Sequence, residues 1–357
     1  MSDLTSENNE SMSQEIKPLI KTKKNTLNAF DSALATVSFI LLQTIMMGII
    51  SLFPLSFRQI FFVSFTISLL VEAVFFFAGA FTCKVVRANI LETTKLNKRP
   101  GILSVLLAIA LSFISLTFFG NLTNVFVAVL EMFGYSQVIS NIEIPNFLTY
   151  FIYVILLAVS PAFFEEFLFR GIILNGFKKL GTIGSVLLSA LIFMLMHGGP
   201  DQTIHQFILG VILGFAYVYS GSLWVPIIIH FVNNFTAVTS IYISTLIGGA
   251  SSSGATQMSY MWLRILISLG VALVLAGIGF ALTYLCMYGI KKIKENRDTK
   301  LKAKMVDEEA LKIDLTQNKN EEKLSKTKKI IMIILFVGCG IYFVAEWISA
   351  LVKGFML

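Results

Sequence analysis

The sequence contains little charge. Only 14% of its 357 residues are Asp, Glu, Lys or Arg, whereas 56% are hydrophobic and the mean hydropathy is +0.79. Because soluble domains usually carry about 25% charged residues, this composition excludes a soluble globular protein. Several apolar runs of about 20 residues indicate instead an all-α fold, a polytopic bundle of transmembrane helices with about nine spans.

Cysteine is also scarce. Cys83, Cys286 and Cys339 lie in apolar runs without metal-type spacing, so the sequence suggests neither a disulfide framework nor a zinc knuckle. The net charge of +7 comes from basic loops, as the orientation of a membrane protein requires. We therefore expect membrane lipid around the protein and no nucleic-acid partner.

The basic residues predict the topology. Residues 1–26 form a polar tail with four lysines and no signal-peptide core, five basic residues lie between positions 84 and 99, and thirteen lie between 291 and 329. We expect these three segments, and hence the N-terminus, in the cytoplasm. The spans are expected at about 33–53, 59–83, 102–119, 147–178, 183–197, 203–219, 223–246, a segment ending at 291, and 330–352.

Two glutamates and an arginine interrupt the fourth apolar run. An ionisable group inside a membrane span is costly unless it is paired or faces a wet cavity, so these charges indicate a functional site. Glu166 and Arg170 are spaced i, i+4 with the acid first, which favours an ion pair on one helix face. Glu165 points about 100° away from that face and stays free for chemistry.

Further polar groups reach the same depth on other helices. At 1.5 Å per residue, Glu165, His197 and Asn234 lie about 18 to 21 Å along their helices from the cytoplasmic ends. His230 shares a helix face with Asn234 at i, i+4. A glutamate, two histidines and an asparagine at one level can activate water and stabilise an oxyanion. His205 lies beyond a turn, and we interpret it as an ordinary interface residue.

These residues resemble the motifs of the CPBP or Abi family of intramembrane proteases, which is related to the type II CAAX prenyl endopeptidases. Residues 165–170 are similar to the family's EExxxR motif, residues 193–197 to FxxxH, and residues 230–234 to HxxxN. The three motifs occur in the family's order and at similar spacing. The resemblance covers about residues 150 to 240 and implies the cell membrane of a bacterium.

The resemblance implies a role for each residue of the site. Glu165 is the general base, His197 its partner on the water, and His230 with Asn234 the oxyanion site, while Glu166 and Arg170 support the helix. The family has been described both as glutamate-type and as metal-dependent. If a metal is present, Glu165, His197 and His230 could bind Zn²⁺, but no HExxH motif occurs and Glu165 would then be lost as the base. We favour no metal and no cofactor.

The expected activity is an endopeptidase that cleaves a peptide or membrane-protein substrate near the cytoplasmic boundary. The alternatives are a non-catalytic bacteriocin-immunity or regulatory scaffold, and an ion-coupled transporter using Glu165 with Glu72 and Glu346. The chain shows no inverted repeat, which argues against a transporter, and we interpret Glu72 and Glu346 as isolated polar contacts between helices.

The expected organisation has six segments: a cytoplasmic tail (1–26), N-terminal transmembrane helices (27–145), a catalytic transmembrane core (146–246), an external loop with the eighth span (247–290), a charged cytoplasmic linker (291–329) and a C-terminal span (330–357).

Overall fold

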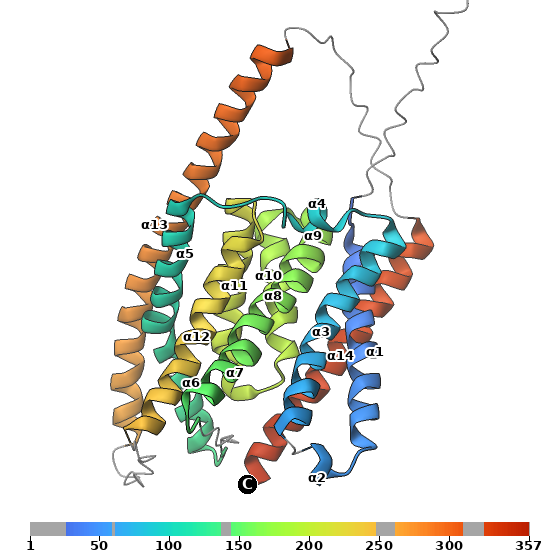
Figure 1. Cartoon of the computed structure of the whole chain (residues 1–357). Helices are drawn as coiled ribbons and strands as arrows, with labels where there is room; N and C mark the ends of the chain where they lie inside the picture. Colours follow the sequence, from blue (N-terminus) through green and yellow to red (C-terminus); the bar gives the residue numbers. More distant parts are fainter. Residues whose placement is uncertain (1–25, 59–60, 137–143, 248–260, 310–324, 357) are drawn as a thin grey trace, which may run out of the picture.

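The computed structural model describes residues 26–58, 61–136, 144–247, 261–309 and 325–356 (Figure 1). Within these ranges the chain is helical and has no strand. Nine of the helices described are long and apolar enough to cross a membrane, which confirms the all-α fold and the nine predicted spans. Most of the predicted tail, most of the loop after the seventh span and the later part of the linker lie outside the described residues.

The N-terminal helices pack against the helix that carries the charges. Asn28 caps α1 (Ala29–Ser51) in a capping box with Asp31, and Pro54 follows the end of this helix. The next helices are α2 (Leu55–Arg58), α3 (Phe61–Val86) and α4 (Ile90–Thr94). Phe39 of α1 contacts Phe75 of α3, and Phe75 in turn contacts Phe169. These contacts hold the first two spans against the fourth.

The third span is longer than predicted. It consists of α5 (Ile102–Ile114), the π-helix η1 (Ser115–Phe119) and α6 (Gly120–Met132), which together form one apolar segment. The predicted end at Phe119 is therefore wrong. Gly120 resembles a helix-ending signal, but the Asn121 amide donates to the Thr117 carbonyl oxygen, and Val125 and Val127 are buried beyond it. Packing of these valines continues the helix.

The fourth span, Phe147–Gly176, changes its helix type along its length. Its parts are α7 (Phe147–Val154), the π-helix η2 (Ile155–Val159), α8 (Ser160–Glu166), the π-helix η3 (Phe167–Ile173) and α9 (Leu174–Gly176). Pro161 has no backbone N–H and cannot continue the α-helical hydrogen-bond pattern, which accounts for η2 just before it. Single π-helical turns frequently accompany functional sites, and η3 contains Arg170.

Two further helices approach each other closely through glycine. After the short η4 (Lys178–Leu180) come α10 (Gly181–Met196), η5 (Pro200–Gln202), α11 (Thr203–Ser220) and α12 (Trp224–Leu246). A Cβ atom added to Gly210 would lie 3.0 Å from the Ala190 Cβ, and one added to Gly214 would lie 2.9 Å from a Val186 methyl group. Small residues thus let α11 lie directly against α10.

The last two helices lie on opposite sides of the bundle (Figure 1). The first, α13 (Met261–Glu309), packs on α5, α6 and α11, whereas α14 (Lys326–Met356) packs on α1. The helix α13 does not end with the apolar run at Lys291 but continues into the charged segment as far as Glu309. Lysine and glutamate are good helix formers, and a Lys291–Glu295 pair at i, i+4 lies on this continuation.

Candidate active site

The acidic pair of the fourth span is buried in the bundle. Glu165 is 6% exposed, and Glu166 and Arg170 are fully buried. Oε1 of Glu166 accepts a hydrogen bond of 2.7 Å from Nη1 of Arg170, so the ion pair predicted from the spacing is present. Nη2 of Arg170 also donates to the Gly210 carbonyl oxygen at 3.2 Å. Arg170 thus links the fourth span to α11.

The same carboxylate oxygen of Glu166 also contacts a histidine. Nδ1 of His230 on α12 lies 3.0 Å from Oε1 of Glu166. A carboxylate can only accept, so Nδ1 carries the proton of this hydrogen bond. The bond fixes the orientation of the imidazole and leaves Nε2 as its other polar atom. Glu166 therefore holds side chains from two elements, η3 and α12.

Phe193 lies among the basic side chains. The ring centroids of Phe193 and His197 are 4.7 Å apart, and those of Phe193 and His230 are 6.0 Å apart. The Arg170 guanidinium carbon lies 4.5 Å from the Phe193 centroid, a cation–π distance. Nδ1 of His197 lies 2.8 Å from the Phe193 carbonyl oxygen, to which it must donate. Nε2 of a neutral His197 is thus an acceptor.

Glu165 differs from its neighbour because it lacks a fixed partner. No hydrogen bond to its carboxylate occurs within the described part of the chain, and its Oε2 is buried. Glu72 on α3 is close enough for its charge to repel that of Glu165. The Oε2 atom of Glu72 is likewise buried without a hydrogen-bond partner among the described residues. Phe76, one turn along α3, packs on Phe164 next to Glu165.

The asparagines of α12 complete the polar group. Nδ2 of Asn233 lies 3.3 Å from Oδ1 of Asn234 and 3.5 Å from Nε2 of His205. The charges of His205 and His230 also lie within interaction range. His205 therefore lies next to Asn233 and within interaction range of His230, although we interpreted it as an ordinary interface residue from its position beyond a turn.

Sequence reasoning missed the approach of His205 and Glu72 to this group. Glu72 carried a signal, because it is an acid inside an otherwise apolar span. All three histidines of the chain also fall after the acidic pair and within the same stretch. Neither signal says which helices are neighbours, and that information comes from the packing.

The alternative zinc site requires Glu165, His197 and His230 as a donor set. The described residues contain no group of three or more His, Cys, Asp or Glu side chains arranged to hold a metal ion. His230 directs Nδ1 to Glu166 and leaves Nε2 free. In this arrangement the three side chains proposed for zinc are not assembled as a donor set.

Comparison with protein-family models matches residues 147–236 to the family described as type II CAAX prenyl endopeptidase Rce1-like. No curated protein and no solved structure matches the chain. The matched segment contains the buried acids, the three histidines and the asparagines of α12, whereas α1 to α6, α13 and α14 lie outside it. Residues 147–236 are thus similar to the type II CAAX prenyl endopeptidases of the Rce1-like family, and the described part of the chain has nine helices that are long and apolar enough to cross a membrane.

Proposed function

We propose that the protein is an intramembrane endopeptidase in which Glu165 is the general base. The observation that supports this proposal is that the two neighbouring acids differ in their hydrogen-bond partners. Oε1 of Glu166 is occupied by Arg170 and His230 while its Oε2 has no partner, whereas neither carboxylate oxygen of Glu165 has a hydrogen bond in the described part of the chain. A free carboxylate beside a fixed polar network can act on a water molecule.

In the proposed reaction Glu165 removes a proton from water as the water oxygen attacks the peptide carbonyl carbon. His197 positions that water, because its Nδ1–H is bound to the Phe193 carbonyl and its Nε2 can accept the second proton of the water in a hydrogen bond. The C–N bond then breaks, and the proton held by Glu165 passes to the leaving nitrogen. No group other than water is consumed.

The oxyanion is stabilised by Asn234 and His230. The Asn234 amide donates directly, while His230 donates from Nε2 only when both of its ring nitrogens carry protons. The carboxylate of Glu166, 3.0 Å from Nδ1, fixes the orientation of the imidazole. Glu166 and Arg170 therefore act as structural support for His230 rather than as reacting groups.

The substrate is a peptide or a membrane protein, cleaved near the cytoplasmic boundary. Glu165 lies about 20 Å along its helix from Lys178. Lys178 is at the end of the bundle that carries most of the lysines and arginines. By the distribution of basic residues this end faces the cytoplasm, with the N-terminus, in a bacterial cell membrane. An extended substrate end or a loosened helix enters from that side.

The proposal is tested with purified wild type and Glu165→Ala incubated with a peptide library. We expect wild type to cleave in the presence of a chelator. The cleavage rate of Glu165→Ala should be about 10²- to 10⁴-fold lower, while its melting temperature should equal that of wild type. Wild-type cleavage rates in Glu165→Ala would contradict the assignment. Binding of a membrane partner by wild-type protein that cleaves nothing would support the scaffold alternative.

Metal analysis distinguishes the two mechanisms. The glutamate mechanism predicts that purified wild type and His230→Ala have the same low zinc content. One tightly held zinc per wild-type chain that is absent from His230→Ala would defeat the metal-free mechanism.

A further inference from the structure

Two lysines from distant parts of the sequence lie at the C-terminal end of α11. Nζ of Lys95, in the segment after α4, lies 4.1 Å from the centroid of the Tyr217 ring. Nζ of Lys294 on α13 donates to the carbonyl oxygen of Val218 at 3.4 Å. Because Tyr217 and Val218 are consecutive, both ammonium groups occupy the same end of α11.

Three lysines at this end have no ion-pair partner among the described residues, although Glu92 of α4 lies three residues before Lys95. In the part of the chain that the structure describes, no carboxylate forms an ion pair with Lys95, Lys178 or Lys294. Burial, together with the charges of Lys178 and Lys294, lowers the pKa of Lys95 from 10.5 to about 7. The C-terminal dipole of α11 compensates Lys294 in part. Lys95 lies instead over an aromatic ring and would gain most from an added anion.

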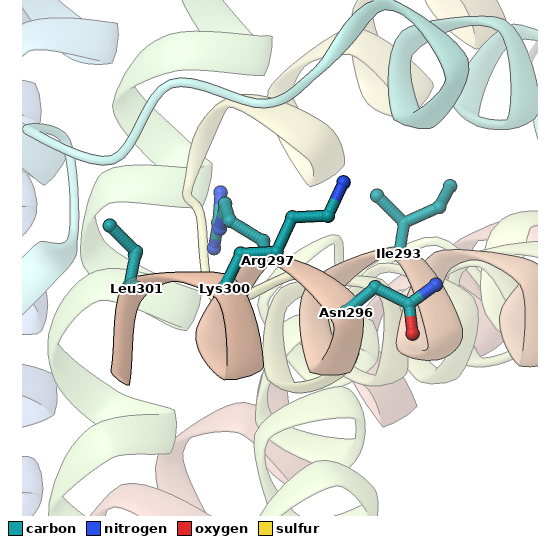
Figure 2. A pocket seen from close by; sticks show the side chains of 5 residues that line it. All are labelled: Ile293, Asn296, Arg297, Lys300 and Leu301. Atoms are coloured by element: carbon teal, nitrogen blue, oxygen red, sulfur yellow. The ribbon is translucent and has the colours of Figure 1, made fainter. Parts of the chain in front are cut away.

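A pocket continues this basic surface along α13. It has a volume of about 470 Å³, and Figure 2 shows the five side chains that line it: Ile293, Asn296, Arg297, Lys300 and Leu301. Nη1 of Arg297 donates to the Arg99 carbonyl oxygen at 3.4 Å, which joins α13 to the segment that contains Lys95. The acids on this stretch are Asp298, 3.9 Å from Arg297, and Glu295, 3.9 Å from Lys291.

The pocket lies at the level where lipid headgroups begin. The apolar run of α13 ends at Ile290, so Lys294 and Arg297 follow about 6 and 10 Å farther along the helix. The Trp224 indole donates to the Leu96 carbonyl oxygen at the same end of the bundle, and tryptophan is typical of the membrane interface. Ile293 and Leu301 give the pocket apolar walls beside its cations.

We propose that Lys95, Lys294, Arg297 and Lys300 form a binding site for the headgroup of an anionic phospholipid. The phosphate accepts hydrogen bonds from the lysine and arginine side chains, and the glycerol region contacts Ile293 and Leu301. Basic clusters next to a transmembrane helix are recognition sites for anionic lipids. The need to orient the protein in the membrane explains exposed lysines, but it does not explain a half-buried Lys95 without an ion-pair partner in the described part of the chain.

The test measures lipid binding to the full chain in detergent by native mass spectrometry and by melting. The ligands are phosphatidylglycerol, phosphatidylcholine and soluble glycerol 3-phosphate. We expect wild type to retain phosphatidylglycerol and to melt at a higher temperature with it than with phosphatidylcholine. The double variant Lys294→Gln/Arg297→Gln should bind phosphatidylglycerol at least about tenfold more weakly.

Lys326→Gln is the matched control, because Lys326 begins α14 at the same end of the bundle but on its opposite side (Figure 1). This variant should keep the preference of wild type. The proposal fails if phosphatidylcholine binds as well as phosphatidylglycerol, or if the double variant binds like wild type. It also fails if glycerol 3-phosphate binds as tightly as the lipid, because the pocket would then be a site for free phosphate esters. Since these readouts do not involve cleavage, they are independent of the proposed protease activity.

Discussion

The span Phe147–Gly176 and the helix α14 (Lys326–Met356) are almost equal in length, at 30 and 31 residues, and both are apolar enough to cross a membrane. They differ in the environment of their charges. Every residue from Phe167 to Ile173 is buried, including Arg170, whereas α14 buries only Cys339, Phe343 and Gly354 and exposes Glu346. Hydropathy therefore identifies both helices as spans but does not distinguish the one that carries chemistry. The distinguishing feature is a buried charge with partners on other helices.

The strongest test of this comparison is Glu166→Ala. Loss of this carboxylate leaves the buried Arg170 without its charged partner, so we expect the free energy of unfolding to fall by about 3 to 5 kcal/mol. The matched change is Glu295→Ala on α13, which removes an exposed partner 3.9 Å from Lys291 and should cost about 1 kcal/mol or less. Melting in detergent compares the two. Equal losses would show that burial of the pair does not matter.

The second test concerns the groups assigned to the oxyanion. Asn234→Ala and His230→Ala should each lower kcat by about 10² to 10³ while KM changes little, because a donor to the developing charge acts mainly in the transition state. Asn121→Ala, on α6 outside the polar group, should keep the wild-type kcat. A rise in KM at constant kcat would instead assign Asn234 and His230 to substrate binding.

A smaller effect is expected for Glu72, the acid from outside the family match. Glu72→Gln keeps the size of the side chain but removes the charge near Glu165, and we expect kcat to fall by roughly 10- to 100-fold through altered positioning. Glu346→Gln changes an exposed acid on α14 and should leave kcat unchanged. Steady-state kinetics compares kcat of the two variants. Equal kcat values would show that Glu72 has only a structural role.

The smallest effect in this series comes from a pair of glycines. Gly210→Ala places a methyl group about 3 Å from Ala190 and should destabilise the protein by about 1 to 3 kcal/mol through overpacking. Gly277→Ala on α13 meets no atom within 4 Å and should change stability by about 0.5 kcal/mol or less. Chemical denaturation of both variants measures the difference. A larger loss for Gly277→Ala would reverse the ranking of the two regions.

The spans could be predicted because the bilayer sets the length of an apolar run. Their ends were harder to predict. Gly120 and Lys291 mark changes in composition, but α6 and α13 continue through them because neighbouring residues still pack or form helix well. Composition indicates whether lipid or water surrounds a segment, but it does not indicate the residue at which the helix ends.

Within the site, the Glu166–Arg170 pair followed from spacing along one helix. The bond from Arg170 to the Gly210 carbonyl and the approach of Glu72 to Glu165 did not, because both depend on which helices become neighbours. The π-helix η3 also changes the direction in which successive side chains point, and no residue within η3 predicts this change. Depth along a helix therefore predicted the level of the site but not all of its members.

The position of Glu166 and Arg170 on one helix has a consequence for biosynthesis. The other partners of this pair, Gly210 and His230, lie 40 and 64 residues from the residues that they contact. At about 5 to 20 residues per second, His230 is synthesised roughly 3 to 13 s after Glu166. During that interval Glu166, in the same span, can neutralise the arginine without any helix that has yet to be synthesised. The local ion pair thus allows the charged span to enter the membrane before the remainder of the site has been translated.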